Sequence, residues 1–346
     1  MAVIADKPWW ERYSRQILFP PIGREGQEKL LQSRVAVIGM GALGTVSANC
    51  LARAGVGFLR LVDRDFVEPS NLQRQILFTE DDANKVMPKA TAALEKLAAV
   101  NSNITYEAII DDVNHTNILD IISDVDLVLD ATDNFEIRFL INEASVKCNK
   151  PWIYGACVAS YGITFSIIPG ETACLHCFFG DLPAHAAAET CDTAGVLAPI
   201  VNVIASLQAM EALKYLSGNS ASLNQQVLFI DLWQNEWTKM TVSRSEDCAV
   251  CVNKKYQYLS GEMEQQSTYL CGREAFQVLP SRRVNLSLGK LTDRLSALGR
   301  VTGNEYLIKF NVDQYEIIIF PDGRAIIKGT ADPKIARSLY ARYVGG

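Results

Sequence analysis

The stretch VAVIGMGALGTVSANCLARAGVGFLRLVDRD, residues 35–65, decides the fold. It opens with a β-branched run that ends in the glycine turn GMGALG, residues 39–44. Small and apolar residues follow at helical spacing to Ala54, and a second apolar run over 58–62 leads into an acidic residue, Asp63. A strand, a glycine turn, a helix and a strand in this order predict the start of a parallel sheet that binds a nucleotide.

The three glycines of this turn, Gly39, Gly41 and Gly44, have the spacing of a dinucleotide-binding turn. Glycine lets the backbone approach a phosphate closely, and the helix that follows offers amide donors at its N-terminus. Asp63 follows the turn at the separation, about 20 residues, expected for a carboxylate that holds ribose hydroxyls. The turn predicts bound phosphates but no particular chemistry, so an NAD-dependent dehydrogenase stays open at this point.

The rest of the chain predicts two domains after an N-terminal helical segment, residues 1–33, in which residues 12–31 are amphipathic. Strand and helix patterns alternate up to residue 150, and strand patterns dominate 152–168 and 227–242. The domain 34–260 is therefore expected to be an α/β, Rossmann-like doubly wound sheet, mostly parallel with an antiparallel extension. A polar linker, SGEMEQQST, precedes residues 268–346, which predict a small C-terminal α+β domain.

The composition argues against two classes of partner. The chain of 346 residues carries 33 Lys and Arg against 39 Asp and Glu, a formal net charge of −6, whereas nucleic-acid binders carry basic faces. The longest apolar run, 195–216, is interrupted by proline, asparagine, glutamine and glutamate, so it predicts a buried helix and no membrane span. The N-terminal residues do not resemble a signal peptide, and nine cysteines then indicate thiols or metal ligands in a cytoplasmic protein.

Charged residues downstream of the turn favour a triphosphate over a nicotinamide. Arg74 and Lys89 are fixed cations, which suit phosphate oxygens whose charge must be neutralised during attack at phosphorus. Asp133 follows a predicted buried strand, 127–130, at the edge where open α/β sheets bind ligands. A carboxylate there can hold Mg²⁺ against the phosphates. Together these residues predict a nucleoside triphosphate with Mg²⁺, and the family resemblance described below implies that the nucleotide is ATP.

Two C-x₂-C pairs, Cys174 with Cys177 and Cys248 with Cys251, predict a metal site. Each pair spans a tight turn that directs two thiolates at one tetrahedral ion, and two such turns complete four sulfur ligands. Four protein ligands leave no open position, so the expected ion is structural Zn²⁺. A further thiol, Cys191, precedes the long apolar helix, where the helix N-terminus would lower the pKa of the thiol and make it a candidate nucleophile.

The motifs resemble those of the ThiF/MoeB/HesA adenylyltransferases, a ubiquitin-activating-like family, and especially its longer bacillus-type ThiF members. The matching motifs are RYSRQ (12–16), GMGALG (39–44), DRDFVEPSNLQRQ (63–75), PKA (88–90), DATDN (130–134), the two cysteine pairs and CDTAGVLAP (191–199). They lie within about the first three quarters of the chain, and the resemblance leaves the role of the C-terminal domain open.

The resemblance implies that the chain adenylates the C-terminal glycine of a small ubiquitin-like sulfur-carrier protein that ends in Gly-Gly, and releases pyrophosphate. Asp133 would position Mg²⁺, Arg74 and Lys89 would neutralise phosphate charge, and Arg15 would reach the neighbouring subunit's site in a homodimer. Cys191 would form a covalent link to the carrier, as a thioester or an acyl-persulfide. The implied nucleotide-binding residues are Gly39, Gly41, Gly44, Asp63, Asp65, Ser70, Asn71, Gln73, Arg74, Lys89, Asp133 and Asn134.

Three alternatives remain at this stage. The carrier of thiamine thiazole synthesis is favoured, with the carrier of molybdopterin synthesis as the alternative. The substrate could instead be the C-terminus of a short peptide, as in microcin-type relatives. A nucleotide-binding adaptor without catalytic activity is the third reading, and pyrophosphate exchange that depends on an added carrier would distinguish an enzyme from it.

Overall fold

The computed structural model describes residues 10–180, 194–263, 269–270, 275–278, 284, 286–330 and 332–344. The chain forms two compact units. The first consists of residues 1–80 and 88–262, and the second of residues 81–87 and 263–346. Within the described residues, no helix is long and apolar enough to cross a membrane.

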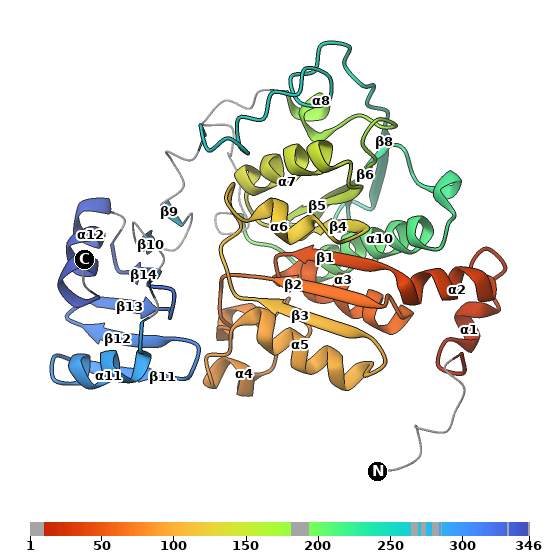
Figure 1. Cartoon of the computed structure of the whole chain (residues 1–346). Helices are drawn as coiled ribbons and strands as arrows, with labels where there is room; N and C mark the ends of the chain where they lie inside the picture. Colours follow the sequence, from red (N-terminus) through yellow and green to blue (C-terminus); the bar gives the residue numbers. More distant parts are fainter. Residues whose placement is uncertain are drawn as a thin grey trace. The chain divides into compact units, whose positions relative to one another are not determined.

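An eight-stranded sheet forms the centre of the first unit, in the order β3-β2-β1-β4-β5-β6-β7-β8 (Figure 1). The strands from β3 to β5 are parallel, and those from β5 to β8 are antiparallel. This confirms the expected mostly parallel, Rossmann-like sheet with an antiparallel extension. The strands are β1 (Arg34–Ile38), β2 (Phe58–Val62), β3 (Thr105–Ile109), β4 (Leu127–Asp130), β5 (Trp152–Val158), β6 (Tyr161–Ile167), β7 (Val227–Asp231) and β8 (Glu236–Met240).

Helices cover both faces of the sheet (Figure 1). Helix α3 packs against both α5 and α10 on one face, while α6 packs against α7 on the other. The central strands are buried on both sides, which is why they are almost wholly apolar rather than alternating. The helices are α1 (Ser14–Ile17), α2 (Gly23–Gln32), α3 (Ala42–Ala54), α5 (Lys89–Val100), α6 (Ile118–Ile122), α7 (Phe135–Cys148), α8 (Leu175–Phe179) and α10 (Ala198–Leu216), with short 3₁₀ turns η1 (Pro69–Asn71) and η2 (Ser220–Ser222).

The amphipathic segment 12–31 forms two helices, α1 and α2, instead of one. Pro20 and Pro21 lie between them, and proline lacks the N–H that a continuous helix would need. The two helices contact each other, so the segment is helical but bent.

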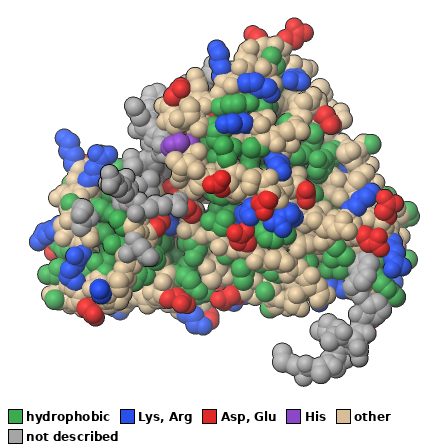
Figure 2. Space-filling view, in the orientation of Figure 1, with side chains coloured by type: hydrophobic (Ala, Val, Ile, Leu, Met, Phe, Trp, Pro, Cys, Tyr) green, Lys and Arg blue, Asp and Glu red, His purple; other side chains and the backbone are tan. Residues whose placement is uncertain are grey.

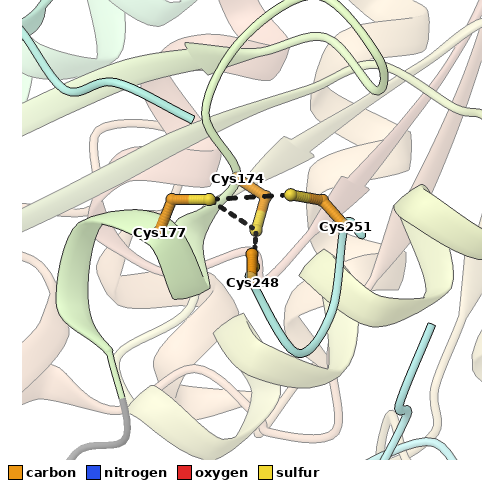
Figure 3. A group of neighbouring side chains, drawn as sticks. All are labelled: Cys174, Cys177, Cys248 and Cys251. Carbon is orange, nitrogen blue, oxygen red and sulfur yellow. Dashed lines mark hydrogen bonds between the residues drawn. The ribbon is translucent and has the colours of Figure 1, made fainter. Parts of the chain in front are cut away.

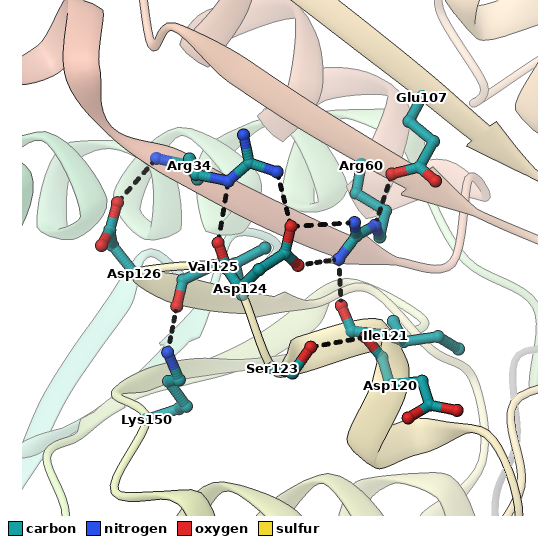
Figure 4. Close-up of polar contacts among 10 residues, drawn as sticks. All are labelled: Arg34, Arg60, Glu107, Asp120, Ile121, Ser123, Asp124, Val125, Asp126 and Lys150. Carbon is teal, nitrogen blue, oxygen red and sulfur yellow. Dashed lines mark hydrogen bonds and ion pairs between the residues drawn. The ribbon is translucent and has the colours of Figure 1, made fainter.

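An ion-pair network ties together the strands β1, β2, β3 and the approach to β4 (Figure 4). The guanidinium of Arg60 contacts Glu107 at 2.7 Å and Asp124 at 2.6 Å, and Arg34 contacts the same Asp124 at 2.6 Å. Hydrogen bonds from Arg60 and Arg34 lower the pKa of Asp124 to about 2, although burial opposes them. On the face shown in Figure 2, Lys and Arg side chains are scattered among Asp and Glu.

The second unit contains a six-stranded sheet in the order β11-β12-β13-β14-β10-β9, and each neighbouring pair is antiparallel. Its core is formed by apolar side chains such as Phe310 and Ile317, which lie together with Leu295 of α11 and Ala336 of α12. The elements are α4 (Glu80–Asn84), β9 (Tyr269–Leu270), β10 (Ala275–Val278), α11 (Leu288–Ser296), β11 (Arg300–Gly303), β12 (Ile308–Val312), β13 (Tyr315–Ile319), β14 (Ala325–Lys328) and α12 (Pro333–Tyr343).

Candidate functional site

The glycine turn connects β1 to α3 and passes close to the end of β4. Gly39 has a positive φ of 94°, and a Cβ added to it would lie 2.6 Å from the carbonyl oxygen of Ala131. A Cβ on Gly44 would overlap the carbonyl oxygen of Gly39, so both glycines are needed for close packing. At Gly41, the nearest atom to an added Cβ is the amide nitrogen of Gln75, 3.9 Å away. A Cβ at Gly41 would therefore make only an ordinary contact, and the backbone here is less tightly packed than at Gly39 and Gly44.

Asp63 links the glycine turn to the segment after β2. Its carboxylate accepts hydrogen bonds from the backbone N–H of Met40, at 2.6 Å, and of Asp65, at 2.7 Å. Burial raises the pKa of Asp63, with Lys89 and the two N–H donors acting in the opposite direction. The carboxylate thus orders the turn, in addition to the ribose contact expected of it.

Lys89 begins α5 and is buried, with 4% of its surface exposed. Its ammonium group lies 3.1 Å from the carboxylate of Asp65, and its backbone N–H donates to the carbonyl of Asp65 at 2.9 Å. A buried ammonium group needs a partner, and the carboxylate of Asp65 supplies one. Lys89 and Asp65, which come from different motifs, are therefore brought together as predicted site residues.

The 3₁₀ turn η1 and the turn that follows it carry two buried amide side chains, Asn71 and Gln75, each with one unused hydrogen-bonding atom. Asn71 accepts a bond from the N–H of Glu68 at 3.1 Å, and its side-chain nitrogen has no hydrogen-bond partner among the residues that the structure describes. The side-chain oxygen of Gln75 is likewise unpaired within the described part of the chain. Both side chains are at most 3% exposed, and buried polar groups are normally paired. The two amides fit a polar ligand beside Gly41.

The other members of this motif lie nearer the surface. Ser70 and Gln73 are exposed, and Arg74 is half-buried, with its guanidinium donating to the carbonyl of Ser70 at 3.0 Å. This bond is exposed, so breaking it to turn the guanidinium toward a phosphate costs little.

Asp133 and Asn134 follow β4 at the carboxyl edge of the parallel strands. Asp133 is exposed, whereas the side chain of Asn134 caps α7 by accepting a bond from the N–H of Ile137 at 2.9 Å. Arg138 holds this turn from within, because its guanidinium lies 3.4 Å from Asp130 and donates to the carbonyl of Thr132 at 2.7 Å. The cap and the arginine fix the backbone on both sides of Asp133.

Arg64 adds a cation to this edge of the sheet. It pairs with Asp112 at 2.9 Å. Burial disfavours its charge, but the carboxylates of Asp112, Asp65 and Asp133 more than compensate and raise the pKa of Arg64. Arg64 therefore lies close enough to Asp133 and Asp65 to influence both carboxylates.

Two predicted site residues, Arg15 and Cys191, are not part of this cluster. Arg15 is an exposed residue on α1. Cys191 lies outside the described residues.

The sequence did not single out Gln75, Arg64 or Arg138; Gln75 and Arg64 lie within the motif DRDFVEPSNLQRQ, and Arg138 follows the motif DATDN by four residues. Gln73 was selected instead of Gln75, yet Gln73 is exposed and Gln75 is buried beside Gly41. Because both residues are glutamine, the residue type cannot show which one is buried. Only the path of the chain through this turn does. For Arg138 the available signal was its position four residues after the helix cap Asn134, which places it one turn into α7.

The four cysteines form one cluster, brought together from α8 and from the segment after β8 (Figure 3). Their sulfur atoms lie within 4.8 Å of one another, with separations of 3.8 Å for Cys174 and Cys177, 3.7 Å for Cys174 and Cys248, and 3.6 Å for Cys177 and Cys251. A regular tetrahedron with Zn–S bonds of about 2.3 Å has sulfur atoms about 3.8 Å apart. The donor set and its spacing therefore fit a zinc ion.

Nearby groups favour the charged form of one of these thiols. Bonds from Cys174 and from the N–H of Ser245 lower the pKa of Cys177 to about 4, against the effect of burial. A thiolate is the form that binds a metal. The Nδ1 atom of His176 lies 3.6 Å from the sulfur of Cys248, next to the four-cysteine cluster.

The comparison with known sequences decides the family. Residues 13–250 match the ThiF family. The chain belongs to the ThiF family. The resemblance inferred from the motifs is thereby confirmed.

Among individual ThiF relatives, the sulfur carrier protein ThiS adenylyltransferase of Bacillus subtilis (strain 168) is 45% identical over 338 residues, 96% of this chain and 99% of that protein. The sulfur carrier protein ThiS adenylyltransferase of Escherichia coli (strain K12) is 41% identical over 241 residues, 69% of this chain and 94% of that protein. The crystal structure of E. coli MccB with ATP has a TM-score of 0.60 at 27% identity, and covers 69% of this chain and 74% of that one. The similarity to the B. subtilis protein extends over both units, whereas the other two leave about a third of the chain unmatched.

Proposed function

We propose that this chain is an ATP-dependent adenylyltransferase that activates the C-terminal glycine of a small ubiquitin-like, ThiS-like sulfur-carrier protein. The observation that carries the proposal is the similarity to the B. subtilis ThiS adenylyltransferase, which covers nearly the whole of both chains. The geometry supports it, because the glycine turn, two unpaired buried amides and a buried lysine meet at one edge of the sheet. The activated carrier would then be converted to a thiocarboxylate.

In this proposal the backbone at Gly41 and the N-terminus of α3 receive phosphate oxygens, because the first N–H groups of a helix have no partner within the helix and Gly41, the N-cap, has no side chain to cap them. Asn71 supplies a side-chain nitrogen that can donate to a phosphate, and Gln75 supplies a side-chain oxygen that can accept from a hydroxyl or amino group; neither atom has a partner within the described residues. Lys89 and Arg74 neutralise the charge that develops when the carrier's carboxylate attacks the α-phosphorus and pyrophosphate leaves. Asp63 and Asp65 provide oxygens for the ribose hydroxyls, and Gly39 and Gly44 keep the turn tight.

Asp133 is proposed to hold Mg²⁺, assisted by the backbone that Asn134 and Arg138 fix. When bound, Mg²⁺ would neutralise phosphate oxygens and make pyrophosphate a better leaving group. Ser70 and Gln73 are exposed, and we propose that they contact the outer phosphates only after the segment 70–74 closes on them.

The zinc ion is proposed to be structural, because four thiolates leave no open coordination position. We also propose that Cys191 provides the thiol that forms the covalent link to the carrier.

We propose that the enzyme is a homodimer in which Arg15 completes the partner's site. The support is an apolar surface beside Arg15: Leu18 is 68% exposed and Phe19 is 56% exposed, and large apolar side chains exposed together are characteristic of interfaces.

The decisive experiment is ATP–pyrophosphate exchange with and without a carrier protein, for Asp133→Ala and for a control, Asp120→Ala, which removes an exposed carboxylate from α6. We expect carrier-dependent exchange in the unmodified protein and in the control, and its loss in Asp133→Ala. Exchange with a heptapeptide but not with a carrier would favour the peptide substrate of the microcin-type alternative, which the likeness to MccB supports. ATP binding without exchange on any carrier would favour the adaptor.

A further inference from the structure

The second unit contains a short piece of chain from the middle of the nucleotide-binding motifs. Residues 81–87 belong to it, although they lie between Arg74 and Lys89 in the sequence. Within this segment the N–H of Met87 donates to the carbonyl of Asp82 at 3.0 Å, and the N–H of Val86 donates to Ala83 at 3.1 Å. Asp82 and Ala83 are buried. The segment is therefore an ordered part of the second unit.

Asn304, in the turn between β11 and β12, holds this segment by two backbone carbonyls. Its side-chain nitrogen donates to the carbonyl of Lys85 at 2.8 Å and to that of Val86 at 3.0 Å. Its side-chain oxygen accepts from the N–H of Tyr306 at 2.8 Å and of Leu307 at 3.1 Å. One half of the amide thus builds the turn of its own hairpin, and the other half binds residues 85–86.

Val86 lies just after α4 (Glu80–Asn84), in a left-handed helix cap that the N–H groups of Val86 and Met87 close onto Ala83 and Asp82. Its φ is +54°, in the left-handed region, which a β-branched residue adopts only at a cost. Strained residues persist where surrounding contacts determine them, and the amide of Asn304 supplies two such contacts at this point.

Lys89 lies only three residues after Val86, so a loosened turn at residues 85–86 can disturb the start of α5. We propose that Asn304 is a positioning residue for ATP: by holding the left-handed turn at Lys85 and Val86, it delivers Lys89 to Asp65 and to the phosphates. This inference rests on the proposed function and gives the C-terminal unit a part in nucleotide binding.

The test uses the full chain and a variant that separates the two halves of the amide. Asn304→Asp keeps an oxygen for the N–H groups of Tyr306 and Leu307 but replaces the donor to residues 85 and 86 by a second oxygen. We expect faster amide hydrogen exchange in a peptide covering 81–90, and a rise of about tenfold in the Kd and KM for ATP, since two hydrogen bonds are lost. The kcat at saturating ATP and carrier should change less than about twofold, because Lys89 itself is retained.

Two further variants complete the test. Val86→Asn in the Asn304→Asp background should recover part of the ATP affinity, because asparagine tolerates the left-handed region better than valine. Gln314→Ala, an exposed change in the same unit, should leave both measurements unaltered.

The inference would be overturned if Asn304→Asp left amide hydrogen exchange over residues 81–90 unchanged. It would also be overturned if amide hydrogen exchange became faster while the Kd for ATP stayed the same. ATP binding is measured without carrier, which keeps this result apart from the proposed function. A protein that binds ATP but shows no carrier-dependent exchange would contradict the proposed function, while a weaker Kd in Asn304→Asp would still support the positioning role.

Discussion

The unpaired amide of Asn71 leads to a prediction in which stability and ATP affinity respond differently. In Asn71→Ala, the bond to the N–H of Glu68 is lost, which costs about 1 kcal/mol. A buried amide nitrogen without a partner in the described residues is removed as well, and an unsatisfied donor of this kind costs about 1–3 kcal/mol. The two effects oppose each other, so we expect the free energy of unfolding without ATP to change by no more than about 1 kcal/mol.

Affinity for ATP should change much more. A hydrogen bond to a charged group contributes about 1.5–3 kcal/mol, so loss of the Asn71 amide should raise the Kd roughly 10- to 150-fold. Urea unfolding of the free protein and calorimetric titration with ATP measure the two quantities.

Asn101 provides the matched control, because it is a buried asparagine whose amide is fully used. Its nitrogen donates to the hydroxyl of Tyr13 at 2.9 Å and to the carbonyl of Ala52 at 2.7 Å. Asn101→Ala should therefore lose about 2–4 kcal/mol of stability and keep its Kd for ATP. If Asn71→Ala instead behaves like this control, the amide of Asn71 serves the fold and the reasoning is refuted.

Further predictions concern the metal, the ion-pair network and the dimer. Cys251→Ser should lower the bound zinc, measured by elemental analysis, to well below one equivalent per chain, and zinc retained at one equivalent would argue against a four-thiolate site. Asp124→Asn should lower the urea midpoint at pH 7 by an amount equivalent to about 1 kcal/mol or less, because the side chain is half exposed. Folding lowers the pKa of Asp124, so the stability that its ion pairs provide is complete above the unfolded pKa near 3.9 and is lost as the pH falls through about 2. A stability difference between Asp124→Asn and the unmodified protein that persists below pH 2 would show that the ion pairs are not its cause. Mixing inactive Arg15→Ala with inactive Asp133→Ala should restore about one quarter of the sites if Arg15 acts across a two-fold interface, and no recovery after subunit exchange would mean that it does not.

Much of the fold could be predicted because its signals are local. The apolar run at 35–38 indicates a strand, the glycines that follow it indicate a turn, and the next apolar segment indicates a helix. The two cysteine pairs indicate a shared metal ion. The amphipathic pattern of residues 12–31 indicated helical structure, and Pro20 and Pro21 mark the place where the structure has a break between α1 and α2.

The parts of the site that could not be predicted depend on contacts between distant residues. Gln73 and Gln75 are the same residue type two positions apart, and only the path of the 3₁₀ turn shows which one is buried beside Gly41. Asn304 lies 218 residues from Val86, in a hairpin turn where an asparagine is explained by the turn alone. Nothing in the local pattern reveals that its amide also binds residues 85–86.

The cysteine cluster joins positions 74 residues apart, Cys174 and Cys248, and α10, β7 and β8 lie on the chain between them. A metal ion there would act as a crosslink, and closing a loop of this length in the unfolded chain is worth about 4 kcal/mol in entropy. Helix α10 is nevertheless held independently by α3, β5 and β6. Removing the ion should therefore free the two cysteine turns while α10 stays in place, so that a protease would cut near residues 174–180 and 244–251 well before the sheet unfolds.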